Sequence, residues 1–171
     1  MDKYKAESIL PYNKKESKSS QVRQMFDTIA PTYDMLNRMM TFGIDKRWRR
    51  TAMKLLAAYH PQTILDIATG TGDLPLLMEK MFSPKSITGI DLSEGMLNIA
   101  RKKIDERNLN DKIKFFCEDC LSLSFADNTF DAITVSFGVR NFEHLEKGYS
   151  EMYRVLKPGG TLIVIEFSTP E

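Results

Sequence analysis

The residues best suited to chemistry lie around a turn that contains two glycines, Gly70 and Gly72. An apolar run, residues 63–68, precedes this turn, and a segment with helical spacing, residues 74–82, follows it. A continuous apolar run is typical of a parallel strand covered on both faces, and glycine lets a backbone turn sharply and approach a ligand. The pattern predicts a strand, a glycine-rich loop and a helix N-terminus, where an open α/β sheet binds its ligand.

A carboxylate follows the glycine loop at a spacing that favours a ligand site. Asp91 ends a second short apolar run and lies 19 positions after Gly72. At the tip of the neighbouring strand, a carboxylate can accept hydrogen bonds from both hydroxyls of a ribose. Many strand-to-helix turns contain glycine for steric reasons alone, so the prediction of a nucleoside site depends on the pairing of the loop with Asp91.

The loop itself narrows the choice of nucleoside. A dinucleotide fingerprint needs a third glycine at position 75, where this chain has Pro75, and Asp73 brings negative charge toward any phosphate. The Gly-Lys-Ser or Gly-Lys-Thr of a P-loop is absent. A cationic or phosphate-free nucleoside therefore suits this loop better, and an NAD-linked oxidoreductase is the first alternative.

The amino-acid composition limits the classes of protein to which this chain could belong. The chain has 171 residues and 42% hydrophobic content, which fits one α/β domain. Its 24 basic and 23 acidic residues create no overall field that would attract nucleic acid. No apolar run approaches the roughly 20 residues that span a bilayer, so we expect a cytoplasmic protein. Cys117 and Cys120 lack a second cysteine pair or a suitably spaced histidine, so we expect reduced, partly buried thiols and no metal.

Three segments are predicted. Residues 1–20 are polar and rich in lysine, which indicates a flexible leader. Residues 21–60 have helical periodicity: two short helices are expected on either side of Pro31, and a third over residues 45–59 begins at Asp45 as its N-cap. Residues 61–171 form the core with the glycine loop. Residues assigned to the buried side of the helices are Phe26, Ile29, Trp48, Ala52, Leu55 and Leu56.

Tyr33 and Asp34 follow the proline that interrupts the helices. A tyrosine at such a place can lay its ring against a site and offer a hydroxyl, which favours a lid that closes over the ligand. The alternative is that the pair merely packs in the helical segment.

Further polar residues follow the other expected strands. Asp119 ends the strand over residues 113–119, next to Cys120, where a carboxylate could accept a hydrogen bond from the amine of adenine; a solvated turn is the alternative. Ser136 lies near the end of the strand over residues 130–138, and Arg140 and Asn141 open the loop beyond it. A fifth strand is expected over residues 161–168. The predicted fold is a mostly parallel, doubly wound sheet.

The glycine loop and Asp91 together resemble the class I S-adenosylmethionine-dependent methyltransferases. Residues 26–49, 127–131, 136–141, 154–160 and 166–168 further resemble the menaquinone and ubiquinone biosynthesis C-methyltransferases, and the resemblance covers nearly everything after residue 20. The Ser-Phe-Gly-x-Arg-Asn segment and the Tyr-Asp-x-x-Asn segment, which includes Asn37, are the more particular to this family. Thr41 and Asp45 stand where the family usually has serine and histidine, so no family histidine is available here. Members of the family continue past the fifth strand into a hairpin, so we expect the C-terminal strands to be absent.

The resemblance implies a Rossmann-like fold and transfer of a methyl group from S-adenosylmethionine to a ring carbon of demethylmenaquinol, a prenylated quinol. The alternatives are a benzoquinol of the ubiquinone pathway, another small phenol, or a non-catalytic cofactor-binding module. A long prenyl tail implies transient, peripheral contact with the membrane surface. Arg140 would stabilise the phenolate, or else simply pair with a nearby carboxylate; Tyr33 and Asn141 would contact the substrate. The residues implied in cofactor binding are Gly70, Thr71, Gly72, Asp91, Asp119, Cys120 and Ser136.

Overall fold

All strand pairs of the computed structural model are parallel, in agreement with the mostly parallel sheet that the sequence predicts. The structure describes residues 4–12, 15–36 and 44–167. Its strand order, β3-β2-β1-β4-β5, places β1 in the centre, with the chain running outward first to one side and then to the other. Such an order creates a crevice beside β1, at the carboxyl ends of the strands. The strands are β1 (Thr63–Ile67), β2 (Ser86–Asp91), β3 (Ile113–Cys117), β4 (Phe130–Ser136) and β5 (Leu156–Ile165).

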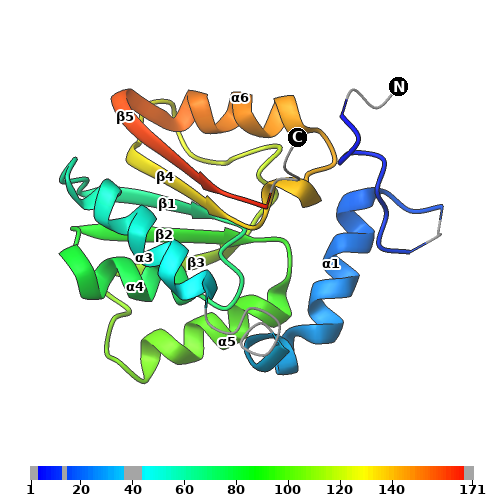
Figure 1. Ribbon diagram of the computed structural model, residues 1–171, viewed down its shortest axis with the longest axis horizontal. Helices are drawn as coiled ribbons and strands as arrows, with labels where there is room; N and C mark the ends of the chain where they lie inside the picture. The colour runs from blue at the N-terminus through cyan, green and yellow to red at the C-terminus, as the bar shows by residue number, and fades with distance from the viewer. Residues whose placement is uncertain (1–3, 13–14, 37–43, 168–171) are drawn as a thin grey trace.

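Helices cover both faces of this sheet (Figure 1). One apolar cluster joins the sheet to α3, α4 and α5, and a second joins the opposite face to α6 and to the segment that follows β3. The helix α1 lies beyond the arrowheads of the strands, across the edge where the crevice is expected. The helices are α1 (Lys18–Ile29), η1 (Ala30–Thr32), α3 (Ile44–Ala57), α4 (Asp73–Phe82), α5 (Glu94–Asp105), η2 (Val139–Asn141) and α6 (Leu145–Val155).

The predicted buried face of α3 is confirmed for Leu56 but was wrong for Trp48 and Leu55. Trp48 and Leu55 are 45% and 64% exposed, whereas Met53 and Leu56 are fully buried. The error arose because the predicted face combined residues from two sides of the helix. An α-helix has 3.6 residues per turn, so the adjacent residues Leu55 and Leu56 cannot both face the core. Asp45 lies in the first turn of α3 rather than before it, and the helix ends at Ala57.

Hydrogen bonds tie the described part of the predicted leader to the core. Lys18 is 4% exposed, and its Nζ donates to the carbonyl oxygens of Ala6, at 2.5 Å, and of Arg140, at 2.9 Å. Glu7 accepts a hydrogen bond at 2.8 Å from the backbone N–H of Leu145, at the start of α6. The sequence alone does not reveal this anchoring, because Arg140 and Leu145 lie more than 100 positions from their partners. Residues 4–12 therefore contact the loop after β4 and the start of α6, while the flexibility of residues 1–20 stays a prediction.

Among the described residues, no helix combines the length and the apolar character needed to cross a membrane.

Replacing Lys18 by methionine tests this anchor. The Lys18→Met variant keeps the length of the side chain but leaves the carbonyls of Ala6 and Arg140 without their donor. Because an unsatisfied buried polar group costs about 1–3 kcal/mol, we expect the free energy of unfolding to fall by about that amount. Denaturant titration measures it, with the exposed Lys15→Met as control. Equal stability of the two variants would show that the anchor contributes nothing.

Candidate functional site

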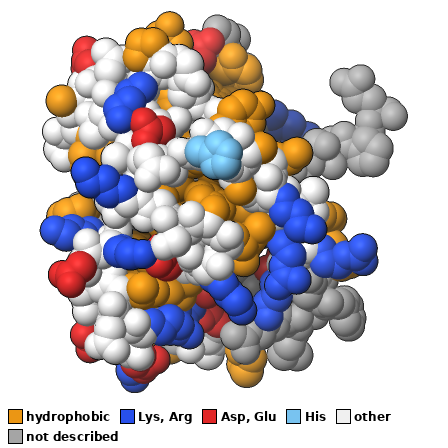
Figure 2. Space-filling model, turned by 90° about the vertical axis from the view of Figure 1, so that its left-hand side faces the viewer, with side chains coloured by type: hydrophobic (Ala, Val, Ile, Leu, Met, Phe, Trp, Pro, Cys, Tyr) orange, Lys and Arg blue, Asp and Glu red, His pale blue; other side chains and the backbone are white. Residues whose placement is uncertain are grey.

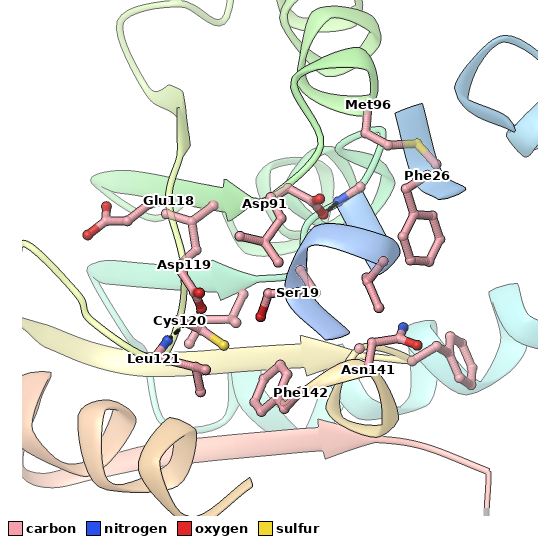
Figure 3. A pocket seen from close by; sticks show the side chains of 18 of the residues that line it. Ser19, Phe26, Asp91, Met96, Glu118, Asp119, Cys120, Leu121, Asn141 and Phe142 are labelled. Atoms are coloured by element: carbon pink, nitrogen blue, oxygen red, sulfur yellow. Dashed lines mark hydrogen bonds between the residues drawn. The ribbon is translucent and has the colours of Figure 1, made fainter. Parts of the chain in front are cut away.

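A cleft opens at the carboxyl edge of the sheet, where the strand order predicts a ligand site. Figure 3 shows Asp91 at the end of β2, Asp119 and Cys120 in the segment that crosses below it, and Phe26 of α1 on the opposite side. The walls are mainly apolar, with a few polar groups between them. Residues that line the cleft include Val22, Phe26, Tyr33, Ile67, Gly70, Ile90, Asp91, Met96, Asp119, Cys120, Leu121, Ser136, Phe137, Asn141 and Phe142.

Asp91 fixes the glycine loop and also faces the cleft. Its Oδ2 accepts a hydrogen bond at 2.8 Å from the backbone N–H of Gly70, and its Oδ1 accepts one at 2.9 Å from that of Ser93. Burial raises the pKa of this carboxyl group, and the backbone donors oppose that rise. Because a carboxylate can accept about four hydrogen bonds, two acceptor positions remain for a ligand.

The three loop residues predicted to bind a cofactor have different surroundings. Gly70 has φ +58°, and a Cβ there would meet nothing within 4 Å, so its position faces open space. Thr71 donates a hydrogen bond at 2.7 Å to Asp34 and lines a second, polar cavity instead. Gly72 lines neither cavity; a Cβ there would approach Phe115 to 2.9 Å, so packing explains this glycine. Cofactor roles stay predictions for all three residues; the positions of Gly70 and Thr71 at the two cavities are compatible with such a role, whereas the position of Gly72 does not support one.

Asp119 and Cys120 both line the cleft, as expected for residues at this strand end. One carboxylate oxygen of Asp119, Oδ1, accepts a hydrogen bond at 2.9 Å from the backbone N–H of Leu121. Its other oxygen is available to a ligand donor. Cys120 is buried, which raises the pKa of its thiol, so the thiol stays protonated and serves as apolar wall. Cys117 is exposed rather than partly buried, and both cysteines are free.

Ser136 closes the cleft at the end of β4. Its Oγ is buried and has no hydrogen-bond partner among the described residues. A buried hydroxyl without a partner costs about 1–3 kcal/mol, and such groups in native structures commonly await a ligand. Ser136 lines both the apolar cleft and the adjoining polar cavity, so a ligand could contact it from either.

The predicted lid segment lies over the site. Tyr33 packs its ring edge-on against Phe26, with ring centroids 6.0 Å apart, and lines both cavities. Asp34 is held by Thr71 and by an ion pair of 2.7 Å with Lys103. The closing movement stays a prediction, and Asn37 and Thr41 lie outside the described residues.

Asn141 lines the cleft, but Arg140 does not. The guanidinium of Arg140, half-exposed, forms an ion pair of 3.1 Å with Glu166 and lies 5.6 Å from the ring centre of Phe167. The structure thus contains the carboxylate pairing that was the alternative to a catalytic role.

A buried carboxylate that the predicted site did not include is Asp66 in β1. It is 1% exposed and accepts hydrogen bonds of 2.6 Å from the hydroxyls of Thr69 and Thr134. Burial is the main reason that its pKa rises to about 6, against the lowering effect of the two hydroxyls and of Arg49. An acidic residue inside an apolar strand was the signal that could have found it.

Asp66 and Arg49 help to form the polar cavity, which adjoins the cleft at Tyr33, Gly70 and Ser136. The Nε of Arg49 is buried without a hydrogen-bond partner among the described residues, and its NH1 lies 4.0 Å from Asp73. One site therefore offers an apolar compartment beside a compartment that contains both signs of charge.

The raised pKa of Asp66 predicts a pH effect on stability. A carboxyl group with a folded pKa near 6 and an unfolded value of 3.8 binds its proton more tightly in the native state, so its ionisation destabilises the fold as pH rises from about 4 to about 6. The wild type should therefore lose up to about 3 kcal/mol relative to Asp66→Asn over this window. Thermal unfolding of both proteins from pH 4 to pH 8 measures the difference.

The matched control is Asp131→Asn, for which the change of stability with pH has the opposite sign. Asp131 accepts hydrogen bonds from Lys157 and from the backbone of Gln62 and Thr63, which hold its pKa below the usual value. The ionised carboxylate of Asp131 stabilises the fold above the unfolded pKa, and this stabilisation is lost as pH falls below about 4. Parallel stability curves for the wild type and Asp66→Asn would contradict the assignment.

The chain is similar in sequence to named methyltransferases. A demethylmenaquinone methyltransferase of Bacteroides fragilis is 55% identical over 168 residues, which cover 98% of this chain and 69% of the relative. A ubiquinone/menaquinone biosynthesis C-methyltransferase of Geotalea daltonii is 46% identical over 90% of this chain and 66% of its own length. The chain thus spans about two thirds of the length of these relatives.

Solved structures agree on the fold. A putative S-adenosyl-L-methionine-dependent methyltransferase of Methanococcus maripaludis superposes with a TM-score of 0.64 at 29% identity, covering 91% of this chain and 68% of that one. A [4+2]-cyclase, SpnF, superposes with a TM-score of 0.73 at 28% identity, covering 86% of this chain and 60% of the cyclase. The profile of the ubiE/COQ5 methyltransferase family matches residues 14–171, and the chain belongs to that family.

Proposed function

We propose that this chain catalyses C-methylation of demethylmenaquinol with S-adenosylmethionine as methyl donor. The observation that supports it most directly is the pair of adjoining cavities that meet at the unpartnered hydroxyl of Ser136. S-adenosylmethionine has the same two-part character, an adenosine and a zwitterionic amino-acid end. The names of the relatives supply the reaction and the substrate.

The residues present fit this cofactor. Asp91 retains two acceptor positions for ribose hydroxyls, and the free oxygen of Asp119 can accept from the adenine amine. Asp66 and Arg49 provide charges of both signs in the polar cavity, as an ammonium and a carboxylate require. Ser136, between the two compartments, would gain the hydrogen bond that it lacks.

When bound, the cofactor supplies a methyl group already activated by its positively charged sulfur. The task of the protein is then to hold an electron-rich ring in line and to exclude water. Phe26 and Phe142 offer apolar walls for an aromatic ring, and the amide of Asn141 can orient a ring hydroxyl. Neither His60 nor His144 lines the cleft, so these histidines do not serve as base for the quinol hydroxyl.

Arg140 remains our candidate for stabilising a phenolate by its charge, provided that it leaves Glu166 when substrate binds. The alternative is that the ion pair only holds the end of β5 against the loop after β4. A benzoquinol or another phenol would use the same cofactor residues. A non-catalytic module would bind the cofactor without turnover.

Binding and turnover test the proposal together. Asp91→Asn keeps the shape of the side chain and removes the charge that strengthens hydrogen bonds to ribose. Because a hydrogen bond to a charged group contributes about 1.5–3 kcal/mol, affinity for S-adenosylhomocysteine should fall at least about tenfold by calorimetry. Glu94→Gln, an exposed carboxylate on α5 outside the cleft, is the control and should bind as the wild type does.

Methyl transfer is measured with radiolabelled cofactor on demethylmenaquinol and on the corresponding benzoquinol. We expect label in menaquinol with the wild type. Cofactor binding without label in any quinol would favour the non-catalytic module, and binding of NADH in place of S-adenosylhomocysteine would refute the proposal.

Two variants of the Arg140 ion pair separate its roles. If the guanidinium acts on the phenolate, Arg140→Ala should retain cofactor affinity and lose about 100-fold or more in kcat. A positioned side chain that acts on the reacting group typically contributes a factor of that size to the rate. Glu166→Gln, which breaks the same pair but keeps the cation, should lose far less. Equal losses in the two variants would assign Arg140 a purely structural role.

A further inference from the structure

The helix α3 exposes a row of large apolar side chains on its outer surface. Ile44, Trp48 and Leu55 are 47%, 45% and 64% exposed. Their spacing of four and seven residues places them on one side of the helix, away from the buried Met53 and Leu56. Such a row is unusual on a helix that already packs its other side into a core, because a single amphipathic stripe suffices there.

Basic residues flank this row. Arg47, Arg50 and Lys54 are exposed and form no ion pair with a residue that the structure describes. Asp45, the only acidic residue of α3, is buried. The whole chain has a formal net charge of only +1, so positive charge is concentrated on this helix. In Figure 2 a group of Lys and Arg side chains lies beside the atoms drawn in grey, next to hydrophobic side chains, while other Lys and Arg side chains are scattered over the rest of this face.

The apolar row continues into the cleft through aromatic contacts. The ring of Trp48 lies 5.6 Å from that of Phe167 and 6.4 Å from that of Phe137, measured between centroids. Phe137 and Phe167 stack at 4.8 Å, and Phe137 lines the cleft beside Ser136. These rings therefore form a continuous apolar contact from the outer surface of α3 to the wall of the cleft.

We propose that the outer face of α3, formed by Ile44, Arg47, Trp48, Arg50, Lys54 and Leu55, docks on the surface of an anionic phospholipid bilayer. A lipid interface matches both halves of this face. The arginine and lysine side chains meet anionic headgroups, whereas the indole of Trp48 and the two aliphatic side chains enter the boundary with the acyl chains. Nucleic acid would match only the cations, because phosphate contacts make no use of exposed leucine and isoleucine.

The role of this docking rests on the proposed function. A prenylated quinol resides in the bilayer, and the aromatic rings from Trp48 to Phe137 would connect that bilayer with the site of methyl transfer. Docking itself needs no cofactor and no turnover, so it can be tested independently.

The sequence contains one tryptophan, Trp48, so its fluorescence reports on this face alone. The protein is titrated with vesicles of phosphatidylcholine containing phosphatidylglycerol, and with vesicles of phosphatidylcholine only. We expect a blue shift of the emission and quenching by brominated acyl chains with the anionic vesicles, and much weaker changes with the neutral ones. Binding is measured in parallel by co-sedimentation.

Charge reversal supplies the decisive comparison. Each basic residue near an anionic surface contributes about fivefold in affinity, so the Arg47→Glu, Arg50→Glu, Lys54→Glu triple variant should bind anionic vesicles about 100-fold or more weakly. The control changes the same charge elsewhere: Lys102→Glu, Lys114→Glu and Lys147→Glu alter exposed lysines of α5, β3 and α6. The control should retain most of the binding, and circular dichroism verifies that both variants fold.

The outcomes are distinct. Equal loss in the two triple variants, binding to neutral vesicles as strong as to anionic ones, or no vesicle binding by the wild type would overturn the proposal. Preferential binding to RNA in competition with anionic vesicles would overturn it as well. Should the wild type bind vesicles as expected but transfer no methyl group, docking would stand and the proposed function would fail.

Discussion

The hydrogen bond between the carboxylate of Asp91 and the backbone N–H of Gly70 connects two neighbouring strands at the point where a ligand must enter. It fixes the loop after β1 in a left-handed turn that most side chains would disfavour, and it orients the carboxylate at the same time. The position of α4, the opening of the cleft and the polar cavity beside it all depend on the path of this loop. The site is thus formed by the end of β2 and the turn after β1.

Much of this arrangement follows from local sequence patterns. Apolar runs predicted β1, β2, β3 and β4, and the helical segments that follow β1, β2 and β4 favoured a mostly parallel sheet. Asp91, Asp119, Ser136 and Asn141 were placed on the cleft because side chains that follow parallel strands gather at one edge. Long-range contacts were beyond such patterns: the anchoring of residues 4–12 depends on carbonyls and amides around Arg140 and Leu145.

Several residues have surroundings that differ from those expected, and each difference has a physical explanation. Gly72 follows the expected spacing, yet close packing against Phe115 and the start of α4 explain its presence. Arg140 belongs to a family motif, yet its guanidinium meets Glu166, a residue 26 positions later whose side-chain direction no periodicity could predict. Asp66 was missed because a carboxylate within a strand is usually disfavoured, and only the two threonine hydroxyls make its burial tolerable. The likeness to a [4+2]-cyclase shows that this fold alone does not determine a reaction.

Phe137 has φ +59°, a backbone conformation that costs a residue with a Cβ about 1–2 kcal/mol. The reversal of the chain at this one residue brings the ring to the aromatic stack of Trp48 and Phe167 while the preceding serine stays at the cleft. Glycine would relieve the strain but would also remove the ring. Because loss of a packed phenylalanine ring costs more than the strain that glycine would relieve, the position keeps a strained backbone in return for an apolar connection between the outer helix and the interior.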